Sequence, residues 1–185
     1  MAIDLPLKID SVLDKKIFLS LQEDLLWWSP ITYSSDKSKK FFMSYHPEDV
    51  LPFYNVSIDL KFRFKKHLKK DITLIRIHTN GQVTESYSNF HTDYSIEGTY
   101  TAVLFTEWEW NTDWGGELVV QNPETKEYHY YPYIPNTVVL FPANWQHCGR
   151  SPNRHTTRMR TSIAFSYIET ERIKDIDLKS ISNLY

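Results

Sequence analysis

From Ile72 to Ile168 the chain is a succession of short runs rich in aliphatic, aromatic and β-branched residues, and turn sequences separate these runs. Asn80-Gly81, Gly115-Gly116 and Ser151-Pro152-Asn153 are among the turn signals. Eight short strands within about 100 residues are typical of a sandwich or a jelly roll, so we expect a mainly β fold. The predicted strands cover residues 72–77, 86–90, 100–106, 117–120, 128–133, 138–141, 146–148 and 161–168.

Helical patterns flank this region. Ser11-Val12-Leu13-Asp14 has the form of a capping box, and apolar residues follow at helical spacing, which predicts an amphipathic helix over 14–26. Residues 56–70 fit a strand as well as a helix, but the lysine-rich end favours a helix. A length of 185 residues suits one domain. We divide it into N-terminal support (1–71), a β core (72–168) and a polar tail (169–185) that packs outside the core as a helix or an extended segment.

The composition limits the classes of function. Lys and Arg number 21 and Asp and Glu 23, and this net charge of −2 argues against a nucleic-acid partner. No apolar run reaches ten residues and the first residues lack a secretory pattern, so we expect neither a membrane span nor secretion. The single cysteine, Cys148, cannot form an internal disulfide, which favours the reducing cytoplasm.

His91-Thr92-Asp93 is the first candidate for chemistry. On a strand, its first and third side chains would point to one face and offer an imidazole nitrogen and a carboxylate oxygen to the same point. His147 follows 56 residues later, after an apolar strand and a turn marked by Pro142. Two histidines and one carboxylate that leave three positions open are the ligand set of non-haem Fe(II) oxygenases. Taken singly, these residues fit a surface or hydrogen-bonding role better; together they indicate a catalytic metal site.

Arginines alternate into the last predicted strand. Arg158, Arg160 and Ser162 lie at alternate positions, and an arginine directed into a barrel-like interior is costly to bury without an anion. A bound dicarboxylate would supply that anion with bidentate geometry. Ser162, on the same face as Arg160, can add a hydroxyl. The plainer interpretation is a solvated basic surface, because Arg150 and Arg154 crowd the same stretch.

In combination, these motifs resemble the Fe(II)/2-oxoglutarate-dependent dioxygenases, in particular their prolyl-4-hydroxylase-like branch. The likeness covers about Ile72 to Ile168 and rests on His91-Thr92-Asp93, Gly115-Gly116-Glu117-Leu118, Phe141-Pro142 to His147, and Arg160 to Phe165. The resemblance implies a cupin-like double-stranded β-helix, with Fe(II) bound by His91, Asp93 and His147 and the distal carboxylate of 2-oxoglutarate bound by Arg160. It also implies that O₂ is consumed, that succinate and CO₂ are released, and that a prolyl or other peptidyl residue, or a small molecule, is hydroxylated.

Two positions depart from the family pattern. Relatives often carry a tyrosine that contacts the co-substrate on the strand after the His-x-Asp motif. The matching position here is Phe105, so Thr101 or another hydroxyl is expected to replace it. The spacing from His147 to the arginine is also longer than in many prolyl hydroxylases, which leaves Arg158 as a second choice beside Arg160.

Two other functions stay open from the sequence alone. A Zn(II) hydrolase could use the same three ligands, but it leaves Arg160 without a task. A non-catalytic jelly-roll module would need the three ligand side chains to be dispersed or hydrogen-bonded among themselves. The aromatic residues Trp108, Trp110 and Trp114 fit either a substrate platform or, more often in β folds, a core cluster.

Overall fold

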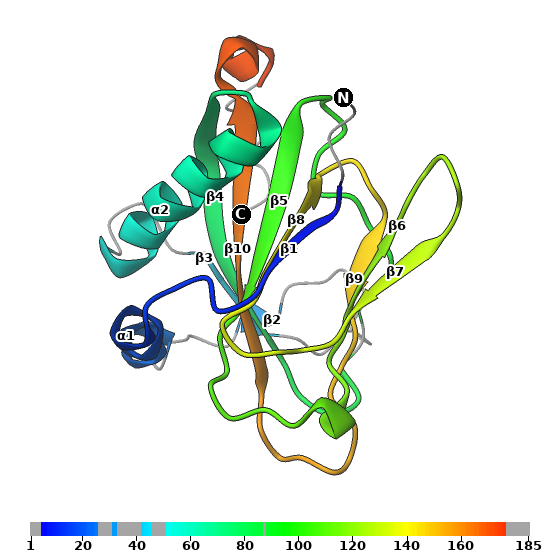
Figure 1. Ribbon diagram of the computed structural model, residues 1–185. Coiled ribbons are helices and arrows are strands. Elements are labelled where there is room, and N and C mark those ends of the chain that lie inside the picture. Colours follow the sequence, from blue (N-terminus) through cyan, green and yellow to red (C-terminus); the bar gives the residue numbers. More distant parts are fainter. Residues whose placement is uncertain (1–4, 26–30, 33–41, 46–50, 87, 177–185) are drawn as a thin grey trace.

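Figure 1 shows a computed structural model of the chain, which describes residues 5–25, 31–32, 42–45, 51–86 and 88–176. The predicted mainly β fold with flanking helices is confirmed. The helices are α1 (Lys15–Leu25) and α2 (Leu51–Leu68), with the short 3-10 helices η1 (Thr112–Trp114) and η2 (Thr170–Asp175). The strands are β1 (Leu7–Ile9), β2 (Ile31–Thr32), β3 (Phe42–Tyr45), β4 (Ile72–Gln82), β5 (Thr99–Phe105), β6 (Leu118–Gln121), β7 (Tyr128–Tyr131), β8 (Val138–Pro142), β9 (His147–Gly149) and β10 (Arg160–Glu169).

The strands form two antiparallel sheets. The large sheet has the order β1-β8-β5-β10-β4-β3-β2, and the small sheet has the order β7-β6-β9. The last strand, β10, therefore lies between β4 and β5, and it pairs with β4 along its whole length. Segments that are far apart in the sequence thus form the centre of the large sheet, which is what brings distant side chains to one place.

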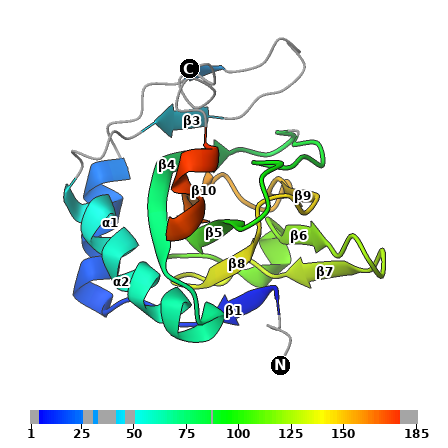
Figure 2. The same ribbon diagram turned by 90° about the horizontal axis from the view of Figure 1, so that it is seen from above.

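The helices α1 and α2 lie against one face of the large sheet (Figure 2). α2 buries Phe53, Leu60 and Phe64, whose spacing places them on one side of a helix. Tyr167 of β10 joins the sheet to α2. The centres of the Tyr167 and Phe64 rings are 5.9 Å apart, and the Tyr167 hydroxyl donates to the Ser57 carbonyl at 2.9 Å. The face of β10 that points away from the small sheet is therefore packed against this apolar layer.

The opposite face of the large sheet packs against the small sheet. Val103 and Phe105 of β5 and Phe141 of β8 meet Leu118 and Val120 of β6 in a second apolar cluster. Because side chains alternate along a strand, the same central strands supply both the helix-facing core and this inner cluster. The inner cluster fills only part of the space between the sheets, and mostly polar side chains line the remainder.

Two expectations about the strands were wrong, and β1 was missed. The described residues of 86–90 form no strand but an irregular segment. Asn80-Gly81 is not a turn: β4 continues to Gln82, because Gly81 pairs with Phe42 of β3 on one side and with Thr161 of β10 on the other. The strand β1, which pairs with β8, was not expected at all.

The helix predictions were closer. α1 matches the predicted 14–26, of which residue 26 lies outside the described residues. Its cap is Asp14, whose Oδ1 accepts from the Lys16 amide at 2.8 Å. The helix expected over 56–70 is confirmed but begins earlier, at Leu51. In the tail, η2 occupies 170–175, and 177–185 lies outside the described residues. No helix in the described part of the chain is both long enough and apolar enough to cross a membrane.

Candidate active site

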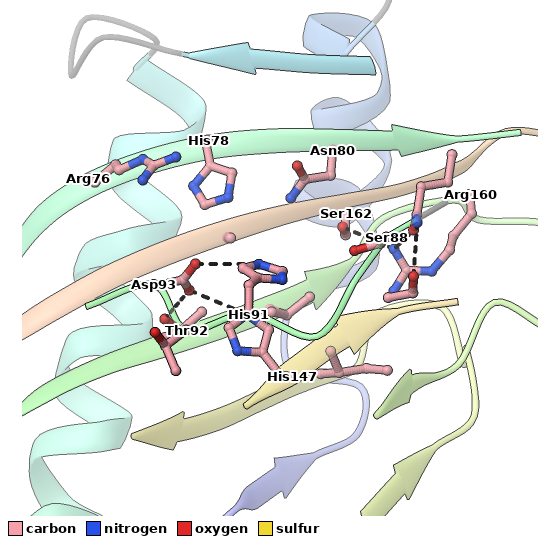
Figure 3. A pocket seen from close by; sticks show the side chains of 16 residues that line it. Arg76, His78, Asn80, Ser88, His91, Thr92, Asp93, His147, Arg160 and Ser162 are labelled. Carbon is pink, nitrogen blue, oxygen red and sulfur yellow. Dashed lines mark hydrogen bonds and ion pairs between the residues drawn. The ribbon is translucent and has the colours of Figure 1, made fainter. Parts of the chain in front are cut away.

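A cavity of about 320 Å³ lies between the two sheets (Figure 3). The large sheet supplies one wall: β4 contributes Arg76, His78, Asn80 and Gln82, and β10 contributes Arg160 and Ser162. The segment around residues 88–93 and the strand β9 supply the facing wall. All six predicted site residues, His91, Asp93, His147, Arg160, Ser162 and Thr101, line this one cavity.

Two main-chain hydrogen bonds bring the two histidines together. The His91 amide donates to the His147 carbonyl at 3.0 Å, and the His147 amide donates to the His91 carbonyl at 2.9 Å. The pair is an isolated antiparallel bridge, so both side chains leave on the same side of the chain. The centres of the two imidazole rings are 4.4 Å apart.

Asp93 reaches the same point by a route that differs from the expected strand. Residues 91–93 are not a strand; the chain bends after His91, and the Asp93 amide donates to the Ala143 carbonyl at 2.9 Å. Asp93 Oδ1 lies 3.8 Å from His91 Nε2, and Oδ2 lies 3.6 Å from His147 Nε2. One potential ligand atom from each of the three residues lies within 4.8 Å of the other two. The three side chains converge, although the strand alternation that was expected to cause this is wrong.

Each imidazole is oriented by a carbonyl two residues before it. His91 Nδ1 lies 2.9 Å from the Asn89 carbonyl oxygen, and His147 Nδ1 lies 3.0 Å from that of Trp145. A carbonyl only accepts hydrogen bonds, so this geometry favours the hydrogen on Nδ1 and the lone pair on Nε2. Hydrogen bonds of this kind fix the orientation of metal-binding histidines.

The protonation states also favour metal binding. Burial raises the pKa of Asp93, but the charges of His147 and His78 and a hydrogen bond from Thr101 outweigh it and hold the pKa below its ordinary value. The Thr101 hydroxyl donates to Asp93 Oδ2 at 2.5 Å, so in this structure it contacts the carboxylate. Burial lowers the pKa of His147. A carboxylate and a neutral imidazole are the forms that bind divalent metals.

Arg160 lies at the other end of the cavity from Asp93 and is only 2% exposed. Its Nε donates to the Gly116 carbonyl at 2.7 Å, and its Nη1 donates to Gln82 Oε1 at 3.0 Å and to Ser162 Oγ at 3.4 Å. Its Nη2 has no hydrogen-bond partner within the described structure. The ion pairs of the described residues do not include Arg160. A buried guanidinium in this state is costly unless an anion joins it.

Gln82 and two glycines surround the guanidinium. Gln82 accepts from Arg160 through Oε1 and donates through Nε2 to the Gly149 carbonyl at 2.9 Å. A Cβ at Gly149 would lie 2.9 Å from Gln82 Oε1 and 3.2 Å from Arg160 Nη1. A Cβ at Gly116, where φ is +85°, would lie 3.3 Å from Arg160 Cδ. The glycines leave the space that the arginine occupies, and Gln82 fixes the direction of its free nitrogen.

Residues 75–167, half of the chain, match the model of the 2OG-Fe(II) oxygenase superfamily. The chain belongs to this superfamily. It is therefore a 2-oxoglutarate-dependent oxygenase, and the expected cofactor Fe(II) and co-substrates 2-oxoglutarate and O₂ are confirmed at the level of the family. Membership decides against the zinc hydrolase and the non-catalytic module. A comparison with curated protein sequences found no match.

Solved structures of other oxygenases share the fold. A Trichoplax adhaerens prolyl hydroxylase in complex with a hypoxia inducible factor peptide fragment is 14% identical, with a TM-score of 0.72 over 89% of this chain and 84% of that one. A Pseudomonas putida prolyl-4-hydroxylase is 14% identical, with a TM-score of 0.65 over 88% of this chain and 91% of that one. HygX from Streptomyces hygroscopicus, with nickel and 2-oxoglutarate bound, is 12% identical, with a TM-score of 0.69 over 89% and 82%. The expected double-stranded β-helix is thereby confirmed.

The cavity of this oxygenase suits the groups that its superfamily uses. Two imidazoles with Nε2 directed inward and one ionised carboxylate form a ligand set for Fe(II) that leaves other coordination positions open. The buried Nη2 of Arg160, which has no hydrogen-bond partner among the described residues, suits a carboxylate of 2-oxoglutarate. The residues present therefore fit both the metal and the co-substrate.

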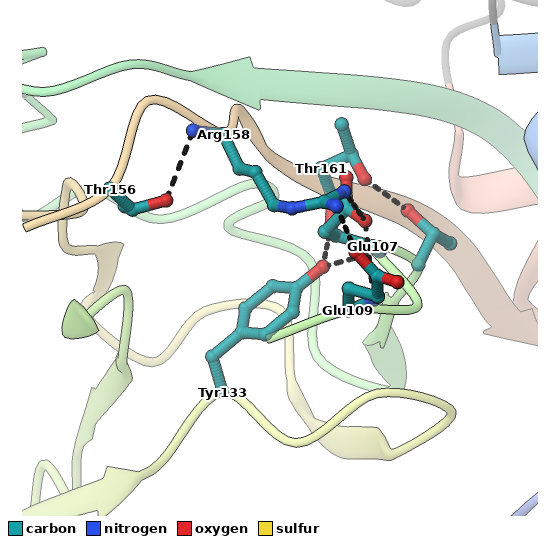
Figure 4. A network of polar contacts seen from close by, with 7 residues as sticks. Glu107, Glu109, Tyr133, Thr156, Arg158 and Thr161 are labelled. Carbon is teal, nitrogen blue, oxygen red and sulfur yellow. Dashed lines mark hydrogen bonds and ion pairs between the residues drawn. The ribbon is translucent and has the colours of Figure 1, made fainter. Parts of the chain in front are cut away.

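Arg158, the second choice for the co-substrate, does not line the cavity. Figure 4 shows it beside Glu107 and Glu109. Its Nη1 lies 3.2 Å from Glu107 Oε1, and its Nη2 pairs with Glu109. Its side chain is 38% exposed, so its charge is both paired and solvated. This arrangement favours Arg160 over Arg158 as the residue that binds the co-substrate.

Phe105, at the position where relatives often have a tyrosine, lies against the Arg160 guanidinium, whose Cζ is 5.6 Å from the ring centre. Its ring stacks on Tyr133 at 4.7 Å. The Tyr133 hydroxyl is already used in the core, where it donates to the Thr161 carbonyl at 2.5 Å and accepts from the Glu107 amide at 2.7 Å (Figure 4). Neither ring offers a hydroxyl to the cavity.

The tryptophans split between core and surface. The centre of the Trp110 ring lies 4.5 Å from that of Tyr133 and 5.6 Å from that of Trp114. Its Nε1 donates to the Gly115 carbonyl at 3.0 Å. Trp108 is half exposed. None of the three lines the cavity, so Trp110 and Trp114 fit the core interpretation better than the substrate platform.

The sequence interpretation overlooked the polar face of β4. Arg76, Asn80 and Gln82 were not considered for the site; a fourth residue of this face, His78, lines the cavity with them. The signal was present, because these four residues alternate with Ile75, Ile77 and Thr79 as a two-sided strand requires. It was missed because the interpretation of Asn80-Gly81 as a turn cut the strand short.

Proposed function

We propose that this oxygenase hydroxylates a C–H bond of its substrate, with His91, Asp93 and His147 as the three protein ligands of Fe(II). The observation that carries the proposal is the convergence of these three side chains in a cavity whose far end holds the buried Arg160. Arg160, with Ser162 beside it, would bind the distal carboxylate of 2-oxoglutarate. Thr101 would act on the metal side through Asp93, and a direct contact with the co-substrate remains its second proposed role.

The chain supplies position and electrostatics. When bound, iron and 2-oxoglutarate supply the oxidising chemistry that places one oxygen atom of O₂ in the product and the other in succinate. The Asn89 and Trp145 carbonyls hold the two imidazoles, and Thr101 holds the carboxylate. As a metal ligand, Asp93 would take the place that a halide needs, which favours hydroxylation over halogenation. Val103 and Leu118 give the cavity an apolar side that limits water.

For the primary substrate we propose a prolyl or other peptidyl residue. Two of the three similar structures described above are prolyl hydroxylases, one of them in complex with a peptide fragment. The site is also open on one side: the His91 side chain is 51% exposed, whereas that of His147 is 6% exposed. An open ligand edge lets a residue within a longer chain reach the metal. A cytoplasmic location remains a proposal that rests on the single cysteine, Cys148.

The test combines metal content, co-substrate turnover and a product search. The protein is purified anaerobically, loaded with Fe(II), and supplied with 2-oxoglutarate, O₂ and a library of proline-containing peptides. We expect about one iron per chain, formation of succinate, and a peptide whose mass increases by 16 Da. Hydroxylation of free small molecules but of no peptide would refute the peptidyl substrate. Failure to form succinate, with the iron bound, would refute the assignment of the co-substrate site.

A further inference from the structure

The inward face of the large sheet is built in four rows, which the strand register defines. Arg160 lies opposite Gln82, Ser162 opposite Asn80, and Ser166 opposite Arg76. Ala164 and His78 form the row between the last two. Arg160 and Ser166 are six residues apart on β10, which at about 3.3 Å per residue separates the first and last rows by roughly 20 Å.

The Asp93 carboxylate lies toward the Arg76 end of these rows. Ser166 pairs with Thr101 of β5 as well as with Arg76 of β4, and the Thr101 hydroxyl contacts the Asp93 carboxylate. Figure 3 shows Arg76 and Arg160 at opposite ends of the cavity, with Asp93 and His91 between them. A co-substrate that extends from the metal to Arg160 therefore leaves the Arg76 end beside the metal for another ligand.

Arg76 is placed by residues around the metal site. It lines the cavity and is half-buried. Tyr94, the residue after Asp93, lies close to both Arg76 and Ser166. Arg76 thus stands on β4, which lies between β10 and β3 in the large sheet, and its position is set by the fold rather than by a surface loop.

The cavity has two guanidinium groups and one carboxylate. Among the described residues that line it, Asp93 alone carries a carboxylate, whereas Arg76 and Arg160 each carry a positive charge. A ferrous ion, the Asp93 carboxylate, the Arg160 guanidinium and the 2-oxoglutarate dianion are neutral as a group. Counted over the described lining residues alone, the loaded cavity then has one positive charge at the Arg76 end, which is complementary to an anion.

We propose that Arg76 binds a carboxylate of the primary substrate and so selects substrates that carry this group close to the carbon that reacts. This inference rests on the proposed function, because it takes the metal and the co-substrate to be bound as described there. The carboxylate comes from one of two sources: a small organic acid, or an acidic side chain next to the target residue in a peptide.

The test measures binding rather than turnover. The protein is loaded with redox-inert Zn(II) and with N-oxalylglycine, an unreactive analogue of 2-oxoglutarate, and ligand-observed NMR measures the affinity of matched probes. One set consists of N-acetyl amino acids, each as the free acid and as the primary amide. The other set consists of blocked tripeptides in which the varied residue is followed by Asp or by Asn. The first set reports a small acid and the second an acidic peptide.

We expect the acidic member of at least one set to bind wild type at least about tenfold more tightly than its amide, as charge-assisted pairing to arginine implies. Arg76→Gln should abolish this preference and Arg76→Lys should restore part of it. Arg63→Gln, on the exposed face of α2, is the matched control and should keep the full preference. Zn(II) and N-oxalylglycine should bind Arg76→Gln and wild type equally.

Two results would overturn the inference. In the first, wild type binds the acids and the amides equally, or binds neither. In the second, the Arg76→Gln variant keeps the preference for acids. Thermal melting checks the fold of the variant, and the comparison of acids with amides on wild type decides the matter without any variant. Failure of the proposed function looks different, because wild type would then not bind N-oxalylglycine in a Zn(II)-dependent manner.

Discussion

Gln82 and Arg160 face each other across the β4–β10 pair, and a hydrogen bond of 3.0 Å from Nη1 to Oε1 joins their side chains. The same glutamine donates to the Gly149 carbonyl, on the strand that carries His147. The guanidinium that we assign to 2-oxoglutarate is therefore held between the two sheets. Its direction depends on a residue that is not itself charged, and this dependence can be tested.

Gln82→Glu should weaken 2-oxoglutarate binding. The new carboxylate would lie against the buried guanidinium and compete with the co-substrate for it, so we expect the KM for 2-oxoglutarate to rise at least about tenfold. Fe(II) binding should not change. The measurement is succinate formation against 2-oxoglutarate concentration, with Gln121→Glu in β6 as the control. An unchanged KM would show that Gln82 does not position Arg160.

Arg160→Ala should have a larger effect. Removing one member of a buried ion pair costs about 3–5 kcal/mol, which corresponds to a loss of at least about 100-fold in affinity. The KM for 2-oxoglutarate should rise by this factor while the iron content stays near that of wild type. Arg158→Ala, which removes a surface ion pair with Glu107 and Glu109, should change the KM little. If Arg158→Ala raised the KM more than Arg160→Ala, Arg158 would be the residue that binds 2-oxoglutarate.

Substitution of any proposed metal ligand should remove iron. His91→Ala, Asp93→Ala and His147→Ala each leave two protein ligands, so we expect a sharp loss of Fe(II) affinity and no turnover. Metal analysis after anaerobic dialysis measures the first effect and succinate formation the second. His129→Ala, at a histidine that does not line the cavity, is the control. Wild-type activity in all three ligand variants would disprove the triad.

Thr101→Val should weaken metal binding without removing a ligand. The variant loses the 2.5 Å hydrogen bond that holds the Asp93 carboxylate, and losses of this kind typically cost 10- to 100-fold in metal affinity. Thr101→Ser keeps the hydroxyl and should retain most of the affinity. If Thr101→Val instead raises the KM for 2-oxoglutarate at constant iron affinity, Thr101 contacts the co-substrate, as expected from the sequence.

His78 should make the metal-free protein sensitive to acid. Burial is the main cause that lowers its pKa from 6.5 to about 3. An unfolded chain binds a proton at this histidine below about pH 6.5, whereas the folded chain does so only near pH 3. Between these values protonation favours the unfolded state, so stability falls as the pH falls. His78→Gln should lose less melting temperature than wild type between pH 7 and pH 4; an equal loss would contradict the prediction.

The sequence predicted the residues of the site better than the geometry that assembles them. The family motifs predict His91, Asp93 and His147 as metal ligands, because metal chemistry restricts which side chains can serve. They do not show that residues 91–93 leave the strand and bend, since a main-chain hydrogen bond to Ala143 decides this and no local pattern encodes it. The choice between Arg158 and Arg160 likewise depends on Glu107 and Glu109, which lie about 50 residues earlier in the chain.

The fold shows the same division. The alternation of apolar residues located most strands of the core, because burial on one face leaves a period of two. Asn80-Gly81 was taken for a turn because this dipeptide favours one in isolation. Tertiary pairing overrides that preference, since strands on both sides supply hydrogen bonds to Gly81. β1 was overlooked because a strand of three residues, Leu7–Ile9, is defined by its partner β8 and carries almost no periodicity of its own.

Metal binding should also affect the local stability of the main-chain bridge between His91 and His147. His91 belongs to the irregular segment before β5, and His147 belongs to β9 of the small sheet. Two reciprocal main-chain hydrogen bonds between these residues join the two segments. An ion held by side chains from both sides of the bridge would add a cross-link at the same place and oppose its opening. The amide hydrogens of these two histidines should then exchange with solvent deuterium much more slowly in the metal-loaded protein than in the apoprotein, so isotope exchange at two backbone positions reports occupancy of the metal site in the absence of any substrate.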